Sequence, residues 1–171
     1  MRSHRPVLLI AIACLAVAPA GAQAKVGNLP SILGSKLGKL TASTPLPVLL
    51  PQSLPFDFGG KVYGVVSGGA KTYSAEFDGA KNCHGANACF LALMSGRKGG
   101  KPSNKVHVTL RGGVTGYFAP LSCGGSCSPP SIEFKQSGVL YELQARVAQQ
   151  GKTDKQLLVA AANSALSHGP R

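Results

Sequence analysis

The stretch that decides the fold runs from Cys83 to Cys127. It begins with NCHGANACF (82–90), continues through VTLRGGVTGYF (108–118) and ends with SCGGSCSPP (122–130). Four of the five cysteines of the chain lie in it, two at each end, with β-branched and aromatic sequence between them. This pattern is typical of a small exported domain in which disulfides staple a sheet.

The cysteine spacings are C-x5-C for Cys83 and Cys89 and C-x3-C for Cys123 and Cys127. Four cysteines allow three pairings, and the sequence leaves all three open. We favour the two local pairs, because each closes a glycine-containing loop. A zinc site that adds His84 is the alternative, but the first spacing lies outside the C-x2–4-C range of structural zinc sites. We therefore expect disulfides, no metal and no other cofactor.

The first residues of the chain predict a secretory signal peptide, residues 1–24. Two arginines precede an unbroken apolar run (7–17), which is too short to span a bilayer, and small residues follow at 22–24. The apolar run continues past Cys14, so we assign this cysteine to the leader rather than to a lipoprotein site. A periplasmic or secreted location follows, and no later stretch approaches the roughly 20 apolar residues of a transmembrane helix.

The chain is strongly basic. It carries 18 Lys and Arg against 6 Asp and Glu, a net charge of +12, which falls to about +10 without the leader. Five basic residues crowd into one region and form the predicted binding surface: Arg97, Lys98, Lys101, Lys105 and Arg111. Such a surface favours anionic partners such as lipid headgroups, lipopolysaccharide or acidic polysaccharide. The alternatives are a protein partner, or charge that serves only solubility.

Specific nucleic-acid recognition is not indicated. The chain has no tryptophan and only 6% aromatic residues, so a base-stacking platform is poorly supported.

Two segments precede the predicted sheet. Residues 25–44 carry leucines on one side of a potential helix, but two glycines weaken it, and we interpret the segment as a flexible N-terminal arm. Contact of this arm with a membrane, or packing on its own domain, are the alternatives. Residues 45–55 contain four prolines and are expected to run extended along the domain with Leu49, Leu50 and Leu54 buried.

The rest of the chain predicts an α+β domain over residues 45–168. Alternating and β-branched patterns predict strands at 62–66, 72–77, 88–94, 106–110, 114–118, 132–135 and 139–147. Residues 95–104, SGRKGGKPSN, read as an exposed and flexible loop. A capping box at Thr153 and Gln156 opens one helix that ends at Gly169. We expect an antiparallel sheet of six to seven short strands with this helix packed on one face.

Catalytic residues are hard to find in this sequence. Glu76 and Asp78 share a strand face, and His84 lies beside a cysteine, so these three are the candidates for a cell-envelope hydrolase. His107 lies between two valines and is expected to face solvent. Residues 95–98 match S-x-x-K, but in a glycine-rich context and without the partner motifs of that enzyme class.

The chain resembles an uncharacterised group of exported bacterial proteins over roughly residues 46 to 167. The resemblance rests on CHGANAC (83–89), GYFAP (116–120), SCGGSCSPPS (122–131), IEFKQSGVLYEL (132–143) and LLVAAANSAL (157–166). It implies the fold and the compartment only, since the group carries no transferable activity. The leading hypothesis is a non-enzymatic binding module, and the hydrolase is the alternative.

Overall fold

The computed structural model describes residues 25–83 and 86–171, so the predicted signal peptide lies outside the described residues. The elements in chain order are β1 (Lys25–Asn28), α1 (Leu29–Leu33), α2 (Ser35–Ser43), β2 (Ser53–Phe56), β3 (Tyr63–Gly68), β4 (Thr72–Asp78), β5 (Phe90–Lys98), β6 (Val106–Thr109), the 3-10 turn η1 (Arg111–Gly113), β7 (Thr115–Ala119), β8 (Ser122–Cys123), β9 (Cys127–Ser128), β10 (Ser131–Gln136), β11 (Val139–Ala145) and α3 (Asp154–His168).

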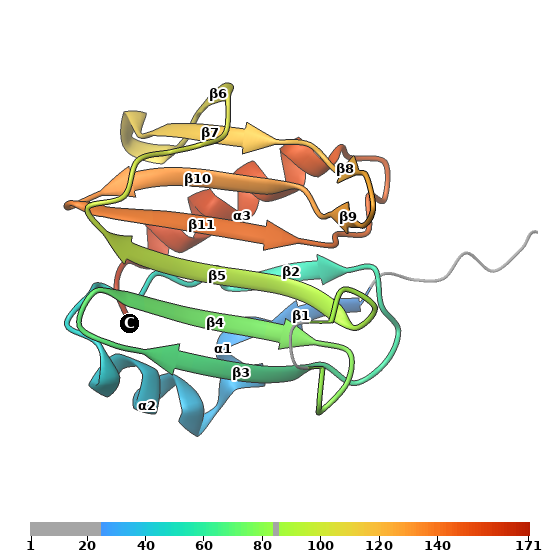
Figure 1. Ribbon diagram of the computed structural model, residues 1–171, viewed down its shortest axis with the longest axis horizontal. Coiled ribbons are helices and arrows are strands. Elements are labelled where there is room, and N and C mark those ends of the chain that lie inside the picture. Colours follow the sequence, from blue (N-terminus) through green and yellow to red (C-terminus); the bar gives the residue numbers. More distant parts are fainter. Residues whose placement is uncertain (1–24, 84–85) are drawn as a thin grey trace, which may run out of the picture.

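A seven-stranded antiparallel sheet forms the centre of the fold, in the order β3-β4-β5-β11-β10-β7-β6. It consists of two meanders, β3-β4-β5 and β6-β7-β10-β11, which join where β5 pairs with β11. The chain passes from β5 to the far edge through residues 99–105, here called the crossover loop (Figure 1). The predicted α+β class, with a C-terminal helix on an antiparallel sheet, is confirmed.

One face of the sheet is apolar and covered. Tyr73 and Phe77 of β4, Met94 of β5, and Tyr141 and Leu143 of β11 are all at most 3% exposed and lie on this face. Helix α3 packs against β10 and β11, while α1 and α2 pack against β3 (Figure 1). The capping box predicted at Thr153 and Gln156 is confirmed at the start of α3. The opposite, open face carries the alternate, mostly polar residues.

The centre of the covered face is filled by an extended segment instead of a helix. Residues 44–52, here called the proline-rich segment, run between α2 and β2 with Leu49 and Leu50 almost fully buried. The Tyr73 hydroxyl donates to Leu49 O and accepts from Leu49 N–H, both at 3.0 Å. The Tyr141 hydroxyl donates to Pro47 O at 2.9 Å. The predicted burial of Leu49, Leu50 and Leu54 is confirmed, but residues 53–55 of the predicted extended stretch 45–55 form part of strand β2.

The interpretation of residues 25–44 as a flexible arm is wrong, because the segment is built into the fold. β1 pairs with β2, and the Asn28 side chain caps α1 by accepting from Ser31 N–H. Leu29, Leu33 and Leu40 are at most 3% exposed. The leucines that suggested an amphipathic helix are divided between α1 and α2 at Gly34, whose φ of 52° ends the first helix. The folded unit thus includes residues 25–44 as well as the predicted domain.

Both disulfides join neighbouring cysteines. Cys83 bonds Cys89, and Cys123 bonds Cys127, as favoured from the loop composition. The thiolates that a zinc site would use are therefore not available. Among residues 25–83 and 86–171, no helix is both long and apolar enough to cross a membrane.

Glycine in β3 allows the N-terminal helices to approach the sheet, and this generates a prediction. A Cβ at Gly64 would lie 2.5 Å from Leu33 Cδ2, so Gly64→Ala should lower the free energy of unfolding by about 1–3 kcal/mol. Gly38→Ala in α2 is the matched control, because its Cβ would meet nothing within 4 Å. This control should raise stability by about 0.5–1 kcal/mol through helix propensity. Denaturant unfolding measures both, and two effects of the same sign would contradict the packing of residues 25–43.

Candidate functional site

Basic side chains gather at the end of the sheet where the β3–β4 turn, the β10–β11 turn and the end of β5 lie side by side. Lys71 lies in the β3–β4 turn and Lys135 near the β10–β11 turn, and the end of β5 lies between them. The register places Arg97 opposite Thr72 on one side and Leu140 on the other, and Leu140 is opposite Lys135. Lys98 N–H donates to Lys71 O at 2.9 Å. We call the group of exposed residues here the basic end: Lys71, Arg97, Lys98, Lys101 and Lys135.

The five basic residues of the predicted binding surface do not lie in one place in the structure. Arg97 and Lys98 belong to β5, which extends to Lys98 and so includes the first part of the predicted 95–104 loop. Lys101 follows in the crossover loop. Arg111 lies in η1, next to the start of β7 and two strands away from β5's partner β11. Lys105 precedes β6, so it lies at the other end of that edge strand from Arg111.

Sequence reasoning missed Lys71 and Lys135. Both lie in or beside predicted hairpin turns, but only the pairing of β11 with β5 brings these two turns to the same place. That pairing joins segments more than forty residues apart in the chain, from Ala92↔Ala145 to Lys98↔Val139. No local pattern in the sequence contains this information.

The crossover loop is fixed to the open face by one carboxylate. Ser103 N–H and Asn104 N–H donate to Glu133 Oε2 at 2.7 and 2.8 Å, and the Ser103 hydroxyl donates to Glu133 Oε1 at 3.1 Å. Asn104 Nδ2 donates to Ser131 Oγ and to Tyr117 O. Glu133 is consequently only 5% exposed. The second half of the loop is therefore held in place and is not the flexible loop that the sequence predicted.

A second carboxylate lies directly beside the first. Glu142 is the cross-strand partner of Glu133. Burial raises the pKa of Glu142, the negative charge of Glu133 raises it further, and Arg97 acts in the opposite direction. One residue of the basic end, Arg97, is thus electrostatically coupled to the neighbour of the carboxylate that holds the loop.

The candidate catalytic carboxylates do come together, on β4. Burial raises the pKa of Asp78 to about 6, with further contributions from the charge of Glu76 and from a hydrogen bond with it. Asp78 is 2% exposed, and its Oδ1 has no hydrogen-bond partner among the described residues. A substrate does not reach a carboxyl group that is buried in this way. The third candidate, His84, lies outside the described residues.

His107 is exposed, as the alternation in β6 predicted. Its ring makes an edge contact with Tyr117, with centroids 4.9 Å apart. Across residues 25–83 and 86–171, no group of three or more His, Cys, Asp and Glu side chains is arranged to hold a metal ion.

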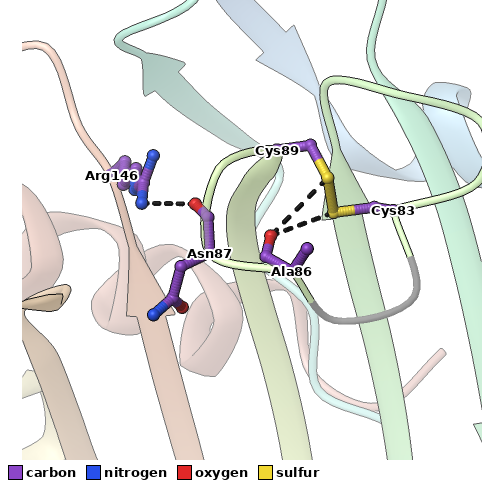
Figure 2. The surroundings of a disulfide bond; sticks show 5 residues. All are labelled: Cys83, Ala86, Asn87, Cys89 and Arg146. Carbon is purple, nitrogen blue, oxygen red and sulfur yellow. Dashed lines mark hydrogen bonds between the residues drawn. A yellow bond between two sulfur atoms is a disulfide. The ribbon is translucent and has the colours of Figure 1, made fainter. Parts of the chain in front are cut away.

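The two disulfide loops lie at the other end of the sheet, here called the disulfide end (Figure 1). Figure 2 shows the first of them, in which the Ala86 carbonyl faces both sulfur atoms and the Arg146 guanidinium donates to Asn87 O. Arg146 follows β11, and its backbone N–H donates to Leu91 O at 2.8 Å. Arg146 therefore connects the Cys83–Cys89 loop to the end of β11.

The Glu133 contacts predict an asymmetric response to two identical substitutions. Glu133→Gln can keep one oxygen toward both N–H donors but removes the negative charge that strengthens these bonds, so the free energy of unfolding should fall by about 1–3 kcal/mol. Amide exchange at Ser103 and Asn104 should become faster. Glu142→Gln is the control, because it removes both the repulsion by Glu133 and the attraction to Arg97, and it breaks no hydrogen bond of the loop, so it should change stability little. Equal losses in the two variants would contradict the Glu133 clamp, by which we mean the bonds from Ser103 and Asn104 to this carboxylate.

The raised pKa of Asp78 predicts a pH dependence of stability. The native carboxyl stays protonated up to a pH of about 6, whereas in the unfolded chain it ionises near 3.8. Between these values the native state binds more protons, so this group's contribution to stability falls as pH rises. Asp78→Asn removes the titration. Melting temperatures from pH 4 to 7 should therefore improve in the variant relative to the original chain as pH rises, and a constant difference would refute the assignment.

In comparisons with known proteins, no family model, curated protein or solved structure matches the chain significantly. The resemblance to exported bacterial proteins stays a prediction from sequence motifs. Function is argued from the chemistry of the surfaces described above, because a fold by itself does not assign one.

Proposed function

We propose that this chain is a non-enzymatic binding module of the bacterial envelope or extracellular space. Its basic end contacts an anionic surface or polymer, such as phosphate-bearing lipid headgroups, lipopolysaccharide or acidic polysaccharide. The observation that carries the proposal is that Lys71, Arg97, Lys98 and Lys135 lie at the same end of neighbouring strands. The two disulfides agree with an oxidising compartment, which is where the predicted signal peptide would deliver the chain.

The distribution of the acidic residues supports a directional interaction. Asp57 and Asp154 line a cleft at the disulfide end, and Asp78 is the last residue of β4, beside the Cys83–Cys89 loop. The disulfide end also carries cations, such as Lys61 and Lys81, but these acids offset part of their charge, whereas among the described residues the cations of the basic end have only Glu142 beside them. An uneven field of this kind orients a protein as it approaches an anionic surface and raises the rate of encounter.

The shape of the basic end suits a broad surface better than a small molecule. Its cations lie on turns and at strand ends, and all five are exposed. Exposed lysines on turns reach separate phosphate or carboxylate groups, whereas a small anion needs donors that converge on one point. Binding through such contacts weakens steeply with added salt.

The hydrolase alternative is supported by one observation, the coupled pair Glu76 and Asp78 with the raised pKa of Asp78. A carboxyl group whose pKa is raised by burial and by a neighbouring carboxyl group is the arrangement of a general acid. The burial of Asp78 outweighs this observation, since a general acid has to reach the bond that it protonates. We therefore interpret the pair as structural.

Removing the charge of the basic end tests the proposed function. A variant with Lys71, Lys98, Lys101 and Lys135 changed to glutamine should bind vesicles of phosphatidylglycerol and phosphatidylcholine about 1,000-fold more weakly, at roughly 1 kcal/mol per cation near the surface. The four side chains are exposed, so the melting temperature should not change. Sedimentation with vesicles across a salt series measures the binding.

The matched control removes the same charge elsewhere. Lys61, Lys81, Lys152 and Lys155 are exposed and lie outside the basic end. Changing these four to glutamine should leave binding nearly intact. Equal losses in the two variants would show that net charge alone governs association. Parallel titrations with lipopolysaccharide and acidic polysaccharide identify the anion, and absence of binding to all three would overturn the proposal.

A further inference from the structure

The disulfide end contains a cleft of about 690 Å³ that the basic surface does not use. Clefts that hold small ligands have volumes of about 300–1,000 Å³. Segments from across the chain form this one: the turn after β2, the connections on either side of the β8–β9 hairpin, the end of β11 and the first turn of α3. Its principal lining residues are Asp57, Leu121, Pro129, Arg146, Val147 and Asp154.

Part of the wall of the cleft is apolar. Pro129, Pro130 and Val147 form buried surface, and Leu121 stands at the rim with 54% of its surface exposed. Leu121 is one of only a few large apolar side chains that the described residues expose. An apolar wall beside an exposed leucine favours a ligand with an aliphatic group.

The cleft carries charges of both signs. Asp57 and Asp154 contribute carboxylates, so two of the six acidic residues of the chain line this one cleft. Arg146 contributes a guanidinium group, which is fixed by its bond to Asn87 O and by its backbone bond to Leu91 O. A guanidinium group has five N–H donors in a planar fork, so Arg146 retains donors for a carboxylate. Asp154 is oriented by Gln149, whose Nε2 donates to Asp154 Oδ1 at 3.0 Å.

Covalent bonds hold the surroundings of the cleft. Cys127 is itself a lining residue and bonds Cys123 across the β8–β9 hairpin. The Cys83–Cys89 loop is linked to the cleft through Arg146. Fixing the walls before the ligand arrives reduces the ordering cost of binding. The hairpin residues 121–128 are all exposed and bury no core side chain, so their staple has a clearer role in shaping this cleft than in holding the fold.

We propose that this cleft binds a short zwitterionic peptide. The peptide's amino group lies toward Asp57 and Asp154, its terminal carboxylate pairs with Arg146, and an aliphatic side chain contacts Leu121 and the two prolines. A purely anionic ligand would face two carboxylates, and a purely cationic ligand would face the arginine. The mixed charges therefore select a molecule that carries both groups. This site is separate from the basic end.

Three matched ligands test the proposed charge pattern: the tripeptide Ala-Leu-Ala, its N-acetylated form and its C-amidated form. Isothermal titration of the oxidised protein in 0.15 M salt should give saturable binding of the free tripeptide. Acetylation removes the ammonium group and amidation removes the carboxylate, so each should weaken binding about tenfold. Failure of the free tripeptide to bind, or tighter binding of either capped form, would overturn the proposal.

A substitution assigns the ammonium group of the peptide to its carboxylate partner. Asp57→Asn should weaken binding of the free tripeptide about tenfold and remove its advantage over the acetylated form. Glu76→Gln makes the same charge change on the open face, outside the cleft, and should have no effect. An equal loss in both variants would overturn the proposal. The four-glutamine variant of the basic end should bind the tripeptide normally, so failure of one proposal is distinguishable from failure of the other.

Discussion

The fold depends on burying the proline-rich segment over the centre of the sheet. A buried extended chain normally needs a neighbouring strand to satisfy its amides and carbonyls. Prolines 45, 47 and 51 remove three amide donors, and Tyr73 meets both backbone groups of Leu49 through its hydroxyl. Tyr141 satisfies Pro47 O in the same manner. Burial raises the pKa of both phenols, that of Tyr141 to about 12, so the two hydroxyls remain protonated donors at any physiological pH.

This segment determines where the helices lie. Because it occupies the covered face above β4, β5 and β11, α1 and α2 pack at the β3 side and α3 packs at the β10 side. Close approach at the β3 side needs glycine at positions 64 and 68, where a Cβ would collide with residues of α1 and α2. All three helices are thereby confined to one face. The open face and both ends of the sheet remain for turns and loops, and these carry every candidate surface of the molecule.

Local signals in the sequence predicted much of this structure, and long-range contacts account for what they missed. The capping box at Thr153, the alternation in β11 and the pairing of each neighbouring cysteine couple depend on residues close together in the chain. The burial of residues 25–43 depends on strand β3, and the basic end depends on the β5–β11 pairing. The cleft that contains Asp57 and Arg146 depends on segments nearly ninety residues apart, so neither residue was singled out.

The two ends of the sheet are stabilised by different means, and this difference bears on their uses. At the basic end, backbone hydrogen bonds and the Glu133 clamp hold the turns, so the exposed cations contribute little to stability and are free to vary with the partner. At the disulfide end, glycine- and serine-rich loops such as Ser122–Ser128 have no apolar side chains to bury, and a disulfide replaces the missing core. A disulfide keeps the wall of the cleft in position without a buried core, which would favour binding of the proposed ligand. Turns held by hydrogen bonds suffice for the proposed contact between separate cations and an extended anionic surface.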